Sequence, residues 1–169
     1  MGANDSPTTT RSIITDYFDW RFNHRTVTNN RLFLIVRKIA SESEAAYQAQ
    51  QSTFNFHFSS PSSPIDFQTL NNIKNIHNEI AKELFADGVV SWSRIITLIS
   101  FSALLAEHII QQQSNDTSTN LIISSVIDWT TNFIDTELQT WLESQNYWVR
   151  KKKEWIEIML FCLFFSLVV

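Results

Sequence analysis

Proline and glycine are scarce in this chain, and their scarcity limits its fold more than any other feature of the sequence. The 169 residues contain two glycines, Gly2 and Gly88, and three prolines, the last of which is Pro64. Phosphate-binding loops, dinucleotide-binding turns and tight β-hairpins need glycine for backbone at positive φ, so these architectures are disfavoured. Because proline interrupts helices, the segment after Pro64 can form long ones. We therefore expect an all-α fold.

The length, composition and charge of the chain narrow the class of protein further. A chain of 19.7 kDa is long enough for one domain with a hydrophobic core. Hydrophobic residues make up 44% of the chain and charged residues 18%, which is typical of folded proteins. The formal net charge is −4, and the one dense basic run is residues 150–153. We therefore expect no nucleic-acid partner.

Five segments carry apolar residues at the three- and four-residue spacing typical of amphipathic helices. Ser63 and Pro64 suit the start of the third segment, and Gly88 suits the residue that follows its end. Shorter apolar pieces between residues 141 and 155 follow the fifth segment. The five segments are residues 11–23, 31–51, 64–87, 92–111 and 119–138.

The segment of residues 92–111 differs from the others because apolar side chains occur on almost every side of the expected helix. A helix of this kind lies at the centre of a bundle or inside a membrane. Ser91 precedes it and can cap its first turn. We predict a bundle of about seven to eight helices in which residues 92–111 form the central hydrophobic helix, wrapped by amphipathic helices.

The pattern divides the chain into three parts. Residues 1–10 are expected to be a flexible N-terminus, residues 11–153 a helical domain and residues 154–169 a hydrophobic tail. The tail follows three lysines, and a membrane-spanning helix needs ~20 apolar residues, somewhat more than the tail offers. A membrane anchor is one interpretation of the tail. The alternatives are a tail cut short and an apolar helix docked on the protein itself.

No group of residues has the spacing of a catalytic or metal site. The histidines lie far apart, and none has a histidine or acid four residues away, as a helical metal site would require. The single cysteine, Cys162, excludes an internal disulfide. We therefore expect a protein that is not an enzyme and has no cofactor and no metal. The histidines are His24, His57, His77 and His108.

The segment of residues 83–106 carries the most specific pattern in the chain, Phe-x-Asp-Gly-x-x-Ser-Trp-Ser-Arg-Ile. It resembles the first homology motif of the B-cell-lymphoma-two family of apoptosis regulators, most closely that of the pro-survival myeloid-cell-leukaemia branch. Residues 12–22 resemble the fourth motif, residues 141–148 the second, and residues 154–169 lie where members carry a mitochondrial anchor. The positions of the first motif are Phe85, Asp87, Gly88, Ser91, Trp92, Ser93, Arg94 and Ile95.

Two departures from the family pattern bear on function. Ser93 replaces the glycine that precedes the arginine of the first motif. The third motif, through which a member acts as a ligand itself, has its best match at residues 36–43. There Ala40 replaces glycine, Ser41 replaces aspartate and Ser43 replaces an apolar anchor. The resemblance therefore implies a poor donor of this helix that keeps the receptor's arginine.

The resemblance also implies a hydrophobic groove that binds the amphipathic death-motif (BH-three) helix of pro-apoptotic relatives. Arg94 would form a charge-assisted hydrogen bond with an aspartate of that helix. From the residues alone, Leu98 and Phe101 fit the core better than a groove. Arg94 needs a partner, which is either an internal carboxylate or the ligand's aspartate. The implied groove residues are Arg94, Leu84, Thr97, Leu98, Phe101, Ile80, Ala81 and Ser91.

Three functions are compatible with the sequence. The favoured one is an anti-apoptotic receptor for death-motif helices at the cytosolic face of the mitochondrial outer membrane or the endoplasmic reticulum, and in the cytosol. The second is a pro-apoptotic, pore-forming member of the same family, which needs a competent third motif. The third is an unrelated, tail-anchored helical adaptor. The replacements at Ser41 and Ser43 favour the first over the second.

Overall fold

Six helices make up the part of the chain that the computed structural model describes, namely residues 8–24, 27–50, 67–112 and 118–148. Within these residues there is no strand, so the all-α prediction is confirmed. The six helices are α1 (Thr10–Asn23), α2 (Arg31–Gln50), α3 (Phe67–Leu84), α4 (Trp92–Gln111), α5 (Thr119–Glu137) and α6 (Gln139–Ser144). Residues 1–7 of the predicted flexible N-terminus, the Ser63–Pro64 helix start and the hydrophobic tail lie outside the described residues. Of the remaining N-terminal residues, Thr9 is the N-cap of α1 and Thr10 its first residue.

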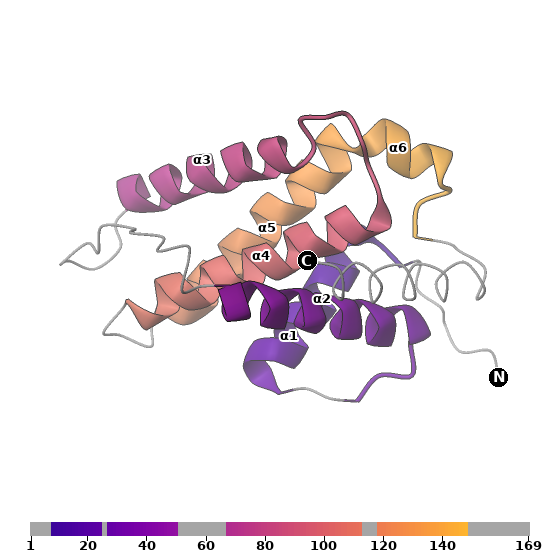
Figure 1. Ribbon diagram of the computed structural model, residues 1–169. Coiled ribbons are helices and arrows are strands. Elements are labelled where there is room, and N and C mark those ends of the chain that lie inside the picture. Colours follow the sequence, from indigo (N-terminus) through magenta and orange to yellow (C-terminus); the bar gives the residue numbers. More distant parts are fainter. Residues whose placement is uncertain (1–7, 25–26, 51–66, 113–117, 149–169) are drawn as a thin grey trace.

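Helix α4 is the central helix of the bundle. It packs against α2, α3 and α5, and Figure 1 shows it running between α3 and α2. Its bounds are those predicted, because Ser91 caps the first turn by accepting a hydrogen bond from the backbone N–H of Arg94. Burying each large apolar side chain of this helix contributes ~1.5–3 kcal/mol. The fully buried apolar residues of α4 are Ile95, Ile96, Leu98, Ile99, Ala103 and Ala106.

In the described residues, α4 is the one helix long and apolar enough to cross a membrane. Within its most apolar stretch, 56% lies buried inside the protein. The apolar character of α4 is thus explained by its place in the core.

Helix α1 lies against α5 and α2, with four fully buried side chains facing them: Ile13, Ile14, Tyr17 and Phe18. It begins with a capping box, in which Thr9 and Ser12 each accept a hydrogen bond from the other's backbone N–H. The predicted 11–23 helix is therefore present.

The described residues contain six helices, where seven or eight were expected. Directly after α6, Asn146 and Tyr147 have φ of 56° and 53°. Two successive residues in the left-handed region end a helix. Trp148 follows this turn. Its ring packs 4.6 Å from that of Trp92, and its Nε1 donates to Thr10 Oγ1.

Candidate functional site

A tight turn joins the end of α3 to the start of α4. The helix ends at Leu84, before the predicted stop at Asp87 and Gly88, because the chain tightens into turns in which Phe85 N–H donates to Lys82. Gly88 then adopts φ of 74°, which a residue with a side chain rarely does. Asp87 Oδ1 accepts from Val89 N–H at 3.0 Å, which fixes the carboxylate on the turn.

This turn places Asp87 against the guanidinium of Arg94, on the first turn of α4. Arg94 Nη1 donates to Asp87 Oδ1 at 2.5 Å, and Nη2 donates to Asp87 Oδ2 at 2.7 Å. Nη1 also donates to the backbone oxygens of Val89, at 2.9 Å, and Leu84, at 3.3 Å. Of the two partners that the sequence left open, Arg94 thus has the internal carboxylate.

The pair remains in contact with solvent. The Arg94 side chain is 32% exposed and that of Asp87 is 53% exposed. Hydrogen bonds from the Arg94 guanidinium, with that from Val89 N–H, lower the pKa of Asp87 to about 2. The hydrogen bond to Asp87 raises the pKa of Arg94 above its ordinary value. Both groups are therefore charged at neutral pH, and water screens their attraction.

The other implied groove residues divide into two groups. Ala81 and Leu98 are fully buried, so in this structure their side chains belong to the core and offer no surface to a ligand. The rest keep an exposed part, and Thr97 and Phe101 follow Arg94 along one side of α4 at three- and four-residue spacing. The exposed or half-buried members are Ile80, Leu84, Ser91, Arg94, Thr97 and Phe101.

Behind Phe101 lies a buried histidine to which the sequence assigned no role. His77 of α3 is fully buried, and its Nε2 is 2.9 Å from Ser102 Oγ on α4 and 3.3 Å from Thr130 Oγ1 on α5. Its ring lies 6.2 Å from that of Phe101. Burial lowers the pKa of His77 to about 4, so the ring is neutral at pH 7. This histidine links α3 to α4 and to α5 behind the site.

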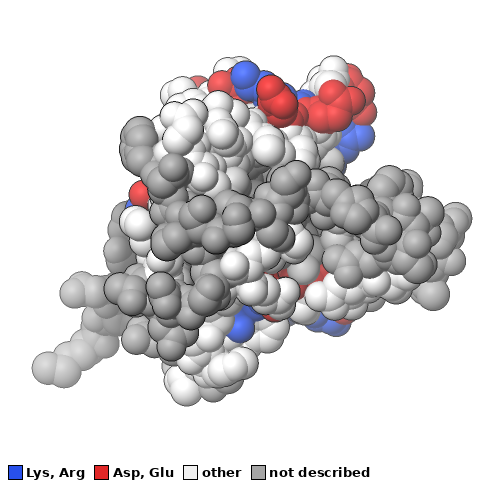
Figure 2. Space-filling view, turned by 90° about the vertical axis from the view of Figure 1, so that its left-hand side faces the viewer, with Lys and Arg blue, Asp and Glu red and all other residues white. Residues whose placement is uncertain are grey.

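Charged side chains are unevenly distributed on the surface near α3. In Figure 2 blue and red atoms gather along the upper edge, at the level of α3, while uncharged side chains occupy much of the remaining described surface. The charged residues of α3 are all exposed, which leaves its apolar residues to face α4 and α5. These charged residues are Lys74, Glu79, Lys82 and Glu83.

A cavity of about 520 Å³ lies elsewhere, between the start of α1 and the region of α6. Hydroxyl, amide and aromatic groups line it together with the carboxylate of Asp135. It includes none of the implied groove residues. The lining residues are Thr8, Thr9, Thr10, Asp135, Gln139, Asn146, Tyr147 and Trp148.

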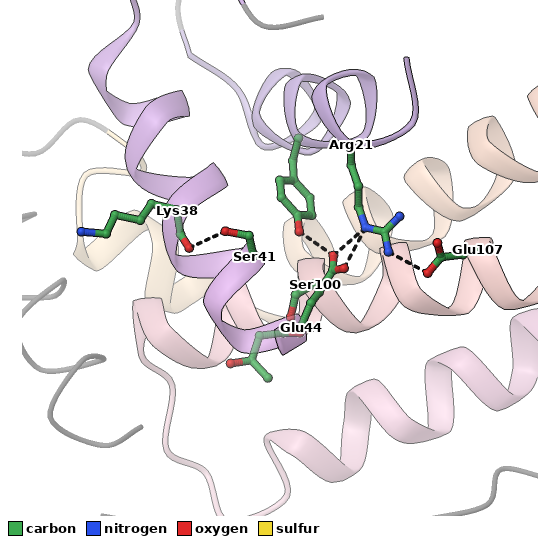
Figure 3. Close-up of polar contacts among 8 residues, drawn as sticks. Arg21, Lys38, Ser41, Glu44, Ser100 and Glu107 are labelled. Atoms are coloured by element: carbon green, nitrogen blue, oxygen red, sulfur yellow. Dashed lines mark hydrogen bonds and ion pairs between the residues drawn. The ribbon is translucent and has the colours of Figure 1, made fainter. Parts of the chain in front are cut away.

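A cluster of ion pairs around Arg21 holds α2 in place, and it was not predicted from the sequence. Arg21 Nε donates to both oxygens of Glu44 on α2, at 2.9 and 2.8 Å, and Nη2 donates to Glu107 of α4 at 2.7 Å, as Figure 3 shows. The hydroxyl of Tyr17 donates to Glu44 as well. Burial alone would lower the pKa of Arg21, but the hydrogen bonds to Glu107 and Glu44 raise it. The arginine is therefore a permanent cation between two carboxylates.

A second ion pair joins the same two helices. Arg37 of α2, which is 6% exposed, donates from Nε to Asp16 Oδ2 at 2.9 Å and from Nη2 to Oδ1 at 2.8 Å. Two ion pairs thus join α2 to α1. In one the arginine is Arg21 of α1, whose Nε is shared between both oxygens of Glu44, and in the other it is Arg37 of α2, which binds Asp16 through two nitrogens.

A family model described as apoptosis regulator proteins of the Bcl-2 family matches residues 36–148. The matched segment covers more than half of the chain. It begins within α2 and includes α3, the turn with Asp87, the whole of α4 with Arg94, and α5 and α6.

Proposed function

The chain belongs to the Bcl-2 family of apoptosis regulators, and on this premise we propose that it is a pro-survival member that binds death-motif helices on the surface between α3 and α4. Such helices place apolar side chains into a groove and fix their register with a charge. Ile80, Leu84 and Phe101 offer partly exposed apolar groups, and Arg94 offers the cation. The family's regulators act by binding, in agreement with a protein that is not an enzyme.

The observation that carries the pro-survival role is the state of α2, which contains the third-motif match. Where an aspartate would be needed, Ser41 Oγ donates to Lys38 O of its own helix at 2.9 Å. Where an apolar anchor would be needed, Ser43 Oγ donates to Ile39 O at 3.0 Å. The nearby Glu44 cannot replace the missing aspartate, because Arg21 and Tyr17 already bind it.

The two ion pairs between α1 and α2 support the same role. A pore-forming member must release its own third-motif helix to pair with another copy. Release of α2 would break the Arg21–Glu44 and Arg37–Asp16 pairs. A hydrogen bond to a charged group contributes ~1.5–3 kcal/mol. This cost and the missing aspartate disfavour the pore-forming alternative. Membership of the family argues against the unrelated adaptor.

Binding of a synthetic death-motif peptide tests the proposal. We expect tight binding to the wild-type chain and at least tenfold weaker binding to Arg94→Ala, equivalent to ~1.4 kcal/mol. Arg11→Ala is the matched control, because Arg11 is an exposed arginine that pairs with Asp128. It should bind like the wild type. Equal affinities of Arg94→Ala and wild type would remove Arg94 from the binding site.

A liposome assay separates the pro-survival role from the pore-forming one. We expect no dye release from vesicles of anionic lipid, because α2 stays attached to α1. Release equal to that of a pore-forming relative would contradict the proposed role.

The branch of the family and the cellular location also belong to this proposal. The likeness of residues 83–106 to the myeloid-cell-leukaemia branch suggests affinity for the ligands of that branch. The tail of residues 154–169 suggests attachment to the cytosolic face of the mitochondrial outer membrane or of the endoplasmic reticulum, in addition to a cytosolic pool. Fractionation of cells that express the chain with and without these residues tests the attachment.

A further inference from the structure

The guanidinium of Arg94 uses only part of its hydrogen-bonding capacity. A guanidinium has five N–H groups, two on Nη1, two on Nη2 and one on Nε. The two on Nη1 serve the oxygens of Leu84, Asp87 and Val89, and one on Nη2 serves Asp87. Within the described part of the chain, Nε–H and the second Nη2–H have no recorded acceptor. Two of the five N–H groups of Arg94 therefore remain available to another acceptor.

These two donors lie on the same edge of the guanidinium plane. Asp87 binds the end edge, which Nη1 and Nη2 form. Nε–H and the outer Nη2–H form the adjacent side edge, and this edge also binds a carboxylate through two parallel hydrogen bonds. A second carboxylate can thus bind Arg94 without displacing the first.

We propose that Asp87 is a positioning residue that holds the end edge of Arg94 so that the side edge receives the aspartate of a bound death-motif helix. This inference rests on the proposed function. An arginine side chain loses much rotational freedom when it is fixed, and a partner that fixes it before the ligand arrives removes that cost from binding. The internal ion pair is then part of the binding site and does not block it.

The geometry around Asp87 suits this role. Its carboxylate is itself fixed by Val89 N–H, on a turn that Gly88 shapes, so it provides a rigid reference for the arginine. The backbone oxygens of Leu84 and Val89 approach Nη1 as well and hold the same orientation. The opposing effect is repulsion between Asp87 and the ligand's carboxylate. Since Asp87 is 53% exposed, water screens that repulsion.

Two peptides and two variants test the inference. The peptides are death-motif helices that are identical except for alanine in place of the central aspartate. Asp87→Asn removes the charge but keeps an oxygen that can accept from Val89 N–H. We expect Asp87→Asn to bind the aspartate peptide about fivefold more weakly than wild type does, and the alanine peptide within twofold of wild type. Asp128→Asn is the control, because it removes an equal charge from the Arg11 pair, and it should change neither affinity.

Each of the other outcomes refutes either the positioning role of Asp87 or the proposed function. Equal or tighter binding of the aspartate peptide by Asp87→Asn makes Asp87 a bystander or a competitor and refutes its positioning role, while the proposed function stands. Equal weakening of both peptides also refutes it, since the effect would not depend on the aspartate. A wild-type chain that binds neither peptide refutes the proposed function and, with it, this inference.

A measurement on the unaltered protein avoids any effect of the variant on folding. The ¹⁵N–¹H resonance of Arg94 Nε, assigned by its loss in Arg94→Lys, should move downfield when the aspartate peptide binds and should not do so with the alanine peptide. An Nε–H resonance that responds equally to both peptides would show that the side edge does not receive the carboxylate.

Discussion

The buried His77 should make the stability of this protein depend on pH. In the folded chain burial lowers the pKa of His77 to about 4, whereas the ordinary value of a histidine in an unfolded chain is 6.5. Between these values the unfolded chain takes up a proton that the folded chain refuses, so acid favours unfolding. Stability is therefore fully present above pH 6.5 and is lost as the pH falls toward 4.

The magnitude follows from the two pKa values. At ~1.36 kcal/mol per pKa unit the full difference is ~3 kcal/mol, and ~2 kcal/mol of it is lost between pH 7.5 and pH 5. Among the described residues no carboxylate contacts the ring to offset this loss. The groups around it are Ser102, Thr130, Phe101, Trp129 and Asn78, of which Asn78 opposes the effect of burial on the pKa.

Urea unfolding of wild type and His77→Gln at pH 7.5 and pH 5 measures the effect. Glutamine is neutral at both values and can still hydrogen-bond to Ser102. We expect the wild-type chain to lose ~2 kcal/mol more than the variant between the two pH values. His24→Gln is the control, because His24 is exposed, and its pH dependence should equal that of wild type. An equal loss in wild type and His77→Gln would refute the argument from burial.

Two further substitutions test a contact and a turn that stabilise the fold. Glu44→Gln removes one of the two carboxylates that bind Arg21 and leaves Glu107, so it should lower the free energy of unfolding by ~2 kcal/mol. Glu42→Gln, on the same helix but half-buried, should change it by less than ~0.5 kcal/mol. Equal unfolding midpoints in urea would count against the Arg21 cluster. Gly88→Ala meets no atom within 4 Å, so its cost should be the ~1–2 kcal/mol of a left-handed backbone alone, and a thermal midpoint equal to that of wild type would contradict it.

The helices were predictable because their signals are local. The bounds of α4 follow from the Ser91 cap and from apolar side chains on every side of residues 92–111. The break after α6 was not predictable, since the chain reverses there through Asn146 and Tyr147 instead of a glycine. Helix periodicity signals which face is apolar, but not where a non-glycine residue adopts a positive φ.

The hydrogen-bond and ion-pair partners of the polar side chains could be predicted less well than the helices. Arg94 was identifiable as a charge on an apolar helix, but its pairing with Asp87 depends on how the turn folds back seven residues earlier. Glu44 lies 23 residues from Arg21 in the sequence, so no local spacing links them. His77 follows the apolar stripe of α3, and only the packed helices reveal that hydroxyl groups surround it.

Three tryptophan rings, those of Trp92, Trp141 and Trp148, hold the beginning of α4 against α6 and the residues that follow it. Trp92 lies 5.0 Å from Trp141 and 4.6 Å from Trp148, and Trp148 also donates to Thr10 at the start of α1. The start of α1 and the last described residue therefore meet beside Trp92, two residues before Arg94. A pull on the chain at Trp148 would act directly on the ring of Trp92, at the beginning of α4.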